Sequence, residues 1–177
     1  SHGMKVLSCM ASQTKNAFVG TAPEASYWLL RSEDADTEQP VEEDYWAAAI
    51  EFADSVGVDV INTSLGYYEF DKGYGGYRYR DLDGHTSLMS HSASMAADKG
   101  IVVVCSAGNS GNDAWKKVTP PGDAEHVLVV GALNSELKNA EFSSIGDTSD
   151  GRVKPDVMAI GVNSVVSGND GTVSKAN

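Results

Sequence analysis

The chain of 177 residues has two cysteines, Cys9 and Cys105, which is too few for a disulfide framework. Both stand in apolar stretches, where a free cysteine behaves as a small hydrophobic residue, so we expect two free thiols with no chemical role. Positive charge is also scarce: 13 Lys and Arg stand against 25 Asp and Glu, for a net charge of -12. No cluster of basic residues is present, and phosphate contacts need such clusters. We therefore exclude a nucleic-acid partner.

Long hydrophobic runs are missing as well, so we expect no membrane span and find no signal-like segment.

The Gly-x-Ser-x-Gly motif of α/β-hydrolases is absent, because in residues 108–112 the second glycine comes one position early. The glycines at positions 73, 75 and 76 lie in a Tyr-rich stretch, which lacks the strand and helix that flank a dinucleotide-binding motif.

What is present is an ordinary globular composition, 41% hydrophobic and 21% charged, on a chain long enough for one domain over residues 1–177. Helical and strand patterns alternate, which predicts an α/β fold with a mostly parallel sheet. Residues 67–84 have no helical period and are long for a connection, so they are predicted to be an inserted surface loop. We expect helices at 2–11, 40–56 and 86–99, and strands at 24–31, 59–63, 101–105, 127–133 and 153–158.

Two of these expectations concern the second helix. Its buried stripe is predicted to consist of Tyr45, Ala49, Phe52, Ala53 and Val56. The acidic run that leads into it, over residues 33–44, is predicted to be solvated surface.

The most informative segment is Lys-Gly-Ile-Val-Val-Val-Cys-Ser-Ala-Gly-Asn-Ser-Gly at positions 99–111. Gly100 suits the end of a helix, and the β-branched run after it predicts a buried parallel strand. Ligands bind at the carboxyl ends of such strands, where this loop begins. The Asn109 amide can donate hydrogen bonds to an oxygen that gains charge. Taken alone, the loop is more typical of a tight turn in which Asn109 adopts a left-handed conformation.

Further blocks fall into one series with this segment. The chain opens with Ser-His-Gly-Met before a helical pattern, residues 59–66 read Asp-Val-Ile-Asn-Thr-Ser-Leu-Gly, and the block Phe-Ser-Ser-Ile-Gly at 142–146 precedes Lys-Pro-Asp-Val-Met-Ala at 154–159. In order and spacing the series resembles the subtilisin-like serine proteases. The resemblance extends over nearly the whole chain, and it implies a three-layer α/β fold with helices on both faces of the sheet.

The resemblance also implies a catalytic assignment. His2 corresponds to the general base and acid, and Asn109 to the amide of the oxyanion hole. A Ser-His pair at a chain start is also left by purification tags, but Gly3 and the following helical pattern favour the functional reading. The family's Asp block precedes the His block, and its Gly-Thr-Ser block follows residues 174–177. Since neither block is present in these residues, we expect an internal piece of a protease domain that is inactive by itself.

Two segments resemble the backbone that lines the primary specificity pocket of subtilisins and pairs with substrate. They are Ser64, Leu65 and Gly66, and Ser106, Ala107 and Gly108. The two glycines would leave that pocket roomy, so by analogy we expect large apolar side chains at the cleavage position. Leu65 on its own would be assigned to the core.

Other candidate sites are weaker. His85, His91 and His126 lack metal-ligand spacing, so no zinc site is expected. Asp-Leu-Asp-Gly at 81–84 resembles the start of a calcium loop without its later ligands and is more typical of a solvated turn. Structural calcium occurs in the family, but no residue here maps onto such a site, and no cofactor is expected. Asn62 begins a glycosylation sequon on a strand predicted to be buried, which argues against its use.

Two readings of the function remain. One is the core of a secreted or periplasmic endopeptidase that acts on peptides or proteins. The other is a non-catalytic module that holds extended peptides in the groove beside residues 64–66. The presence of both His2 and Asn109 favours the enzyme, because the fold needs neither. Without its flanks the chain should expose apolar surface and a sheet edge, and we expect it to self-associate.

Overall fold

The computed structural model describes residues 1–14 and 16–177, and the chain divides into two compact units. The first unit comprises residues 1–28, 133–140 and 160–177, and the second comprises residues 29–132 and 141–159. Among the described residues, no helix combines the length and the apolar character needed to cross a membrane.

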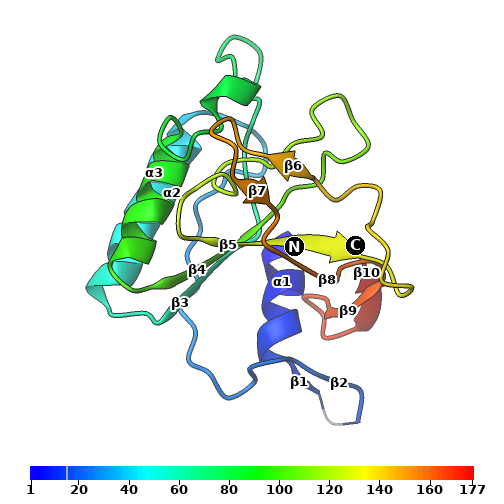
Figure 1. Cartoon of the computed structure of the whole chain (residues 1–177). Helices are drawn as coiled ribbons and strands as arrows, with labels where there is room; N and C mark the ends of the chain where they lie inside the picture. The colour runs from blue at the N-terminus through cyan, green and yellow to red at the C-terminus, as the bar shows by residue number, and fades with distance from the viewer. Residues whose placement is uncertain (15) are drawn as a thin grey trace. The chain divides into compact units, whose positions relative to one another are not determined.

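The first unit is a helix packed against a hairpin (Figure 1). Helix α1, His2–Ala11, confirms the expected N-terminal helix. Strands β9, Ser164–Ser167, and β10, Val173–Ala176, pair antiparallel, and a shorter hairpin joins β1, Gln13–Thr14, to β2, Phe18–Val19. Ser8 is the buried contact between helix and hairpin, because its Oγ accepts a 2.8 Å hydrogen bond from the Ser167 N–H.

The second unit is an α/β layer built on a four-stranded sheet of order β3-β4-β5-β8. The strands are β3, Val60–Thr63; β4, Val102–Ser106; β5, Leu128–Leu133; and β8, Val157–Ile160. Strands β3, β4 and β5 are parallel, with Val60 opposite Val102 and Val104 opposite Leu128. The predicted α/β class and parallel sheet are therefore confirmed.

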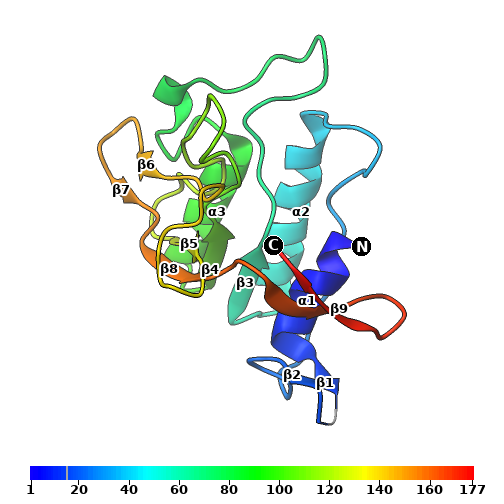
Figure 2. The same ribbon diagram turned by 90° about the vertical axis from the view of Figure 1, so that its right-hand side faces the viewer.

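Helices α2, Val41–Ser55, and α3, Leu88–Asp98, pack together on one face of this sheet (Figure 2). Side chains from the sheet and both helices form the core, among them Trp46, Ile50, Met89, Val103 and Val129. Positive φ angles of 74° at Gly57 and 98° at Gly100 end the two helices, as the sequence predicts.

Helix α2 buries a stripe that differs in part from the predicted one. Trp46, Ile50 and Ala53 face the core, whereas Tyr45, Phe52 and Val56 are exposed. Of the predicted stripe Ala53 is buried, and the buried residues Trp46 and Ile50 each follow a predicted position by one residue. In the structure the stripe is completed by Glu42 and Glu43, two carboxylates that sequence analysis placed in solvated surface.

The two buried carboxylates anchor the segment 67–84. Glu42 accepts a 2.9 Å hydrogen bond from the Tyr67 hydroxyl, and Glu43 accepts one of 2.6 Å from the Tyr77 hydroxyl. The segment contains a short 3-10 helix, η1, Tyr79–Asp81, and an isolated bridge between Glu69 and Gly76. It is the connection that the sequence predicts, but its two ends are tied to helix α2 and the core.

Two predicted strands are corrected. Residues 24–31 are not assigned to a strand, and the side chains of Leu29 and Leu30 within them are exposed. The predicted strand 153–158 divides at Pro155 into β7, Val153–Lys154, which pairs with β6, Gly146–Asp147, and β8. Proline removes a donor from the ladder.

Candidate active site

The two segments predicted to line the site leave adjacent parallel strands at the same edge of the sheet. Thr63, at the end of β3, lies opposite Cys105 in β4, so residues 64–66 and 106–109 emerge side by side. This carboxyl edge is where ligands bind in open α/β sheets. At the start of the first segment, the Asn62 side-chain amide donates a 3.2 Å hydrogen bond to Ser64 Oγ.

The loop after β4 is fixed by two backbone hydrogen bonds of Ala107, the residue directly before Gly108. The Ala107 N–H donates to Val130 O at 3.0 Å, and the Thr119 N–H donates to Ala107 O at 3.3 Å. Gly108 has a φ of 100°, which a side chain would strain. Asn109 itself is exposed and does not have the left-handed φ of the turn alternative, so its amide stands at the protein surface.

A third segment, Thr119 and Pro120, lies so close to Gly66 and Gly108 that neither position has room for a side chain. A Cβ atom at Gly66 would lie 2.5 Å from Pro120 O and 2.7 Å from Thr119 Oγ1, and one at Gly108 would lie 2.9 Å from the same Thr119 Oγ1. The sequence predicts open space at these glycines. In the structure Thr119 fills it, and the Tyr67 N–H fixes this segment by donating to Pro120 O at 3.1 Å.

Sequence analysis therefore missed Thr119 and Pro120, which line the site beside Gly66 and Gly108. The only signal for them is the Pro-Pro pair at 120–121, which the structure shows with a cis bond between the two prolines. Leu65 does pack against the core, as its residue type alone suggests.

An aromatic pair frames the same edge. The rings of Tyr68 and Trp115 stack with centroids 4.6 Å apart and an interplanar angle of 15°. This stack joins the segment after β3 to the loop that follows Asn109. Within that loop the Trp115 Nε1–H donates to Val118 O at 3.1 Å.

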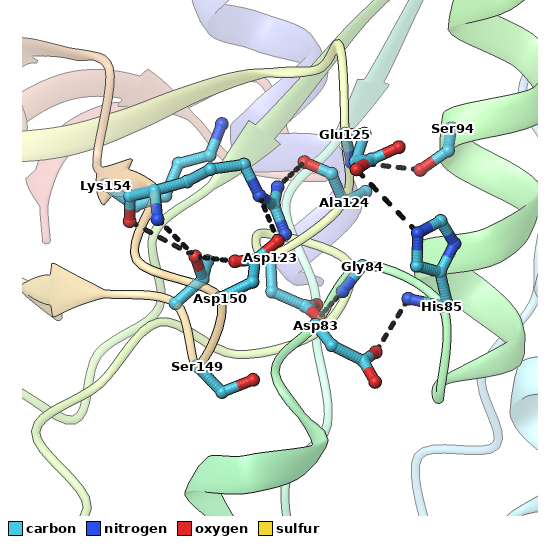
Figure 3. A network of polar contacts seen from close by, with 12 residues as sticks. Asp83, Gly84, His85, Ser94, Asp123, Ala124, Glu125, Ser149, Asp150 and Lys154 are labelled. Atoms are coloured by element: carbon cyan, nitrogen blue, oxygen red, sulfur yellow. Dashed lines mark hydrogen bonds and ion pairs between the residues drawn. The ribbon is translucent and has the colours of Figure 1, made fainter.

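A buried carboxylate, Asp123, connects the chain just after Thr119 and Pro120 to Gly84 and to helix α3 (Figure 3). Asp123 accepts hydrogen bonds from the Gly84 N–H, at 2.9 Å, and from the Ser90 hydroxyl on helix α3. Burial raises the pKa of Asp123, and the hydrogen bonds and the Arg152 charge only partly oppose that effect. This carboxylate therefore binds a proton more readily in the folded chain than in water.

The segment 81–84 acts as a turn rather than a cation loop. Asp83 accepts hydrogen bonds from the N–H groups of His85 and Thr86, at 2.8 and 2.7 Å (Figure 3). Burial alone would raise the pKa of Asp83, but these bonds outweigh it and lower the pKa. Within residues 1–14 and 16–177, no group of three or more His, Cys, Asp or Glu side chains is arranged to hold a metal ion.

His2 belongs to the first unit. It lies in the first turn of α1, as expected, and is exposed. The structure thus brings seven of the eight predicted site residues together in the second unit, and it describes His2 within the other unit.

Both cysteines are free thiols, as predicted. Cys105 is a residue of β4 whose side chain lies in the core, and burial raises its pKa to about 12. Asn62, by contrast, is exposed although its strand was predicted to be buried, because β3 has helices on only one face within its own unit. The sequon at Asn62 is therefore not hidden by that unit.

Comparison with known proteins agrees with this geometry. The family model of the subtilases, peptidase family S8, matches residues 1–177. The chain is 31% identical over 173 residues to a thermophilic serine proteinase of Bacillus sp. (strain AK1), covering 96% of this chain and 37% of that protein. It is also 31% identical over 166 residues to subtilisin DY of Bacillus licheniformis, covering 91% of this chain and 51% of that protein.

Among solved structures, the patellamide maturation protease PatA superposes with a TM-score of 0.78 at 22% identity, covering 98% of this chain and 57% of that one. At this identity the likeness shows the fold. The chain spans roughly a third to a half of the length of these two curated relatives.

Proposed function

This chain belongs to the subtilase family, and from that premise we propose that it forms the core of a subtilisin-like serine endopeptidase. The observation that carries the proposal is the paired edge of β3 and β4. There, two backbone segments with the family's Ser-Leu-Gly and Ser-Ala-Gly sequences lie side by side, and the exposed amide of Asn109 follows directly. A substrate strand added along this edge would place its carbonyl near that amide.

In the proposed reaction a serine hydroxyl attacks the peptide carbonyl, while His2 takes the hydroxyl proton and then gives it to the leaving amine. The carbonyl oxygen becomes an oxyanion, to which the Asn109 amide donates a hydrogen bond. Ser64, Leu65 and Gly66 would flank the bound peptide on one side, and Ser106, Ala107 and Gly108 on the other. Water then hydrolyses the acyl-enzyme and regenerates the serine.

These 177 residues contain no Gly-Thr-Ser motif, and nothing in them corresponds to the family's Asp block. We therefore propose that the chain by itself does not hydrolyse peptides, and that the parent protein supplies both groups. We further propose that the parent is secreted or resides in the periplasm, where its substrates would be peptides or proteins.

The side chain accepted before the cleaved bond should be smaller than the resemblance alone suggests. Thr119 Oγ1 lies where the Cβ atoms of both site glycines would point, so it narrows the space between the two segments. We propose that small or medium side chains are preferred there.

The test is active-site labelling of the parent protein, expressed with flanking sequence on both sides of residues 1–177. A fluorophosphonate probe should label the wild-type protein at one serine. His2→Ala should lose labelling because the serine is no longer activated, and the 177-residue chain should not react. A folded parent that does not label but binds extended peptides would overturn the enzyme proposal and favour the non-catalytic module.

A further inference from the structure

We infer that Ser144 is a positioning residue that fixes the peptide on either side of Asn109. The inference rests on the proposed role of Asn109 in the oxyanion hole. Sequence analysis recorded Ser144 only as part of the block 142–146 and gave it no role. In the structure it is fully buried in the second unit.

Ser144 uses two groups to hold the two neighbours of Asn109. Its backbone N–H donates to Gly108 O at 3.0 Å, and its Oγ accepts from the Ser110 N–H at 3.0 Å. One buried residue therefore bonds to the residue before and the residue after the exposed amide. The side chain makes the second of these bonds, so a substitution can remove that bond alone.

The adjoining contacts leave this loop little freedom to adjust. The Gly111 N–H donates to Phe142 O at 2.8 Å, and a Cβ atom at Gly111 would lie 2.3 Å from Ser143 O. Ser144 Oγ is also 3.0 Å from the position that a Cβ atom at Gly108 would take. The loop and the segment 142–144 thus run in backbone contact, and the Ser144 hydroxyl is the side-chain bond between them.

Oxyanion donors act only within about 2.7–3.1 Å of the developing charge, so small shifts of the donor matter. Without the Ser144 hydroxyl the Ser110 N–H would be left buried without its acceptor. The loop would move to reach water, because an unsatisfied buried donor is costly. Asn109 would move with it. The loss should fall on kcat, since the oxyanion exists in the transition state and not in the bound substrate.

Ser143 offers a matched control. It is 1% exposed and adjacent in sequence, but its Oγ accepts a 2.9 Å hydrogen bond from the Ala132 N–H at the end of the sheet, away from Ser110. Ser143→Ala therefore removes the same atom, with the same burial, from a bond that does not touch the neighbours of Asn109. A purely structural effect of losing a buried hydroxyl should appear in both variants.

The experiment measures kcat and KM for a peptide substrate in the active parent protein. A misplaced donor should lower kcat about tenfold for Ser144→Ala, by analogy with other small displacements in active sites, with KM changed less than twofold. Ser143→Ala should keep kcat within about twofold of the wild type. In an Asn109→Ala background, Ser144→Ala should cause no further loss, because the donor that it positions is gone.

Two other outcomes overturn the inference. One is a Ser144→Ala protein with wild-type kcat, and the other is an equal loss of kcat with and without Asn109. If Ser144→Ala does not fold, Ser144→Cys keeps a slightly larger and weaker acceptor at the same position and should show an intermediate kcat. A parent protein that never labels with the fluorophosphonate probe would remove the proposed function and this inference together. A labelled parent that is insensitive to Ser144 would remove the inference alone.

Discussion

At the scale of single residues, the site is determined by small side chains that accept close neighbours. Gly66 and Gly108 both face Thr119, and Ser144 lies behind Gly108. Small residues of this kind can be assigned to a site from sequence only where a family motif includes them. Their importance comes from contacts between segments that are distant in the chain.

Thr119→Gly should widen the space between the two substrate segments. In the parent protein we expect kcat/KM for a substrate with Phe before the cleaved bond to rise about tenfold relative to one with Ala, which is within the range that pocket volume usually supplies. The ratio of the two kcat/KM values checks this. A ratio unchanged by Thr119→Gly would show that Thr119 does not limit the pocket.

The buried carboxylate of Asp123 should make stability depend on pH in a defined direction. Its pKa is raised in the folded state, so the native chain holds this proton more tightly than the unfolded chain. The bound proton therefore adds to the free energy of unfolding at low pH. This stabilisation is lost as pH rises from 3.8 through the raised pKa.

Asp123→Asn should lack that contribution. Urea unfolding at several pH values from 3 to 8 should show wild-type stability falling relative to the variant as pH increases. Asp59→Asn, which removes an exposed carboxylate, controls for net charge. A constant difference between wild type and Asp123→Asn across this range would contradict the raised pKa.

At the scale of elements, helix α3 is tied to helix α2 through its N-cap. Ser87 Oγ accepts from the Ser90 N–H and donates to Glu43 at 3.0 Å, and Glu43 also accepts from Tyr77. Burial raises the pKa of Glu43, while these hydrogen bonds oppose the rise. One cap residue therefore joins two helices and the segment between β3 and α3.

Ser87→Ala should lower the free energy of unfolding by about 1–2 kcal/mol, the upper part of the range for N-caps, because a buried carboxylate also loses a donor. Urea unfolding measures this, with Ser92→Ala in the same helix as the control. A loss no greater than that of Ser92→Ala would show that the cap contributes little.

Element boundaries also show what could be predicted from sequence. Helices α2 and α3 and strands β3, β4 and β5 were predicted nearly in place, because glycines end both helices and β-branched runs mark the strands. The prediction of a strand at 24–31 was wrong, because an apolar run in the sequence does not show whether a neighbouring strand exists to pair with it. The α2 stripe failed because Glu42 and Glu43 find donors that lie about 25 to 45 residues away along the chain.

At the scale of the whole molecule, one face of the sheet in the second unit carries exposed apolar side chains. Val60 in β3 lies opposite Val102 in β4, and Leu128 in β5 lies opposite Val104, two residues further along β4. Val60, Val102 and Leu128 are 57%, 52% and 39% exposed. The helices of that unit cover the opposite face. A contiguous apolar strip of this kind favours association between copies.

We therefore predict that the 177-residue chain self-associates. Light scattering after size exclusion should give a mass above 18.7 kDa that depends on concentration. Val102→Lys places a charge at the centre of the strip and should shift the distribution toward monomer, whereas Lys72→Glu on the exposed 67–84 segment should not. A monodisperse wild-type monomer at all concentrations would contradict this prediction.

Only the site residues that belong to family motifs could be predicted from the sequence. Residues 64–66 and 106–109 leave one edge of the sheet, because the parallel strands β3 and β4 end together. Thr119 and Ser144 could not be inferred, since their roles depend on contacts across segments that no local pattern records.

The most direct measurement is the steady-state hydrolysis of a peptide by the active parent protein and its Asn109→Ala variant. If the exposed amide at the end of β4 stabilises the oxyanion, kcat should fall by about 10²–10³, the loss found in a subtilisin itself when this kind of donor is removed, while KM stays nearly constant. A variant with unchanged kcat would show that this edge of the sheet is not where the transition state is held.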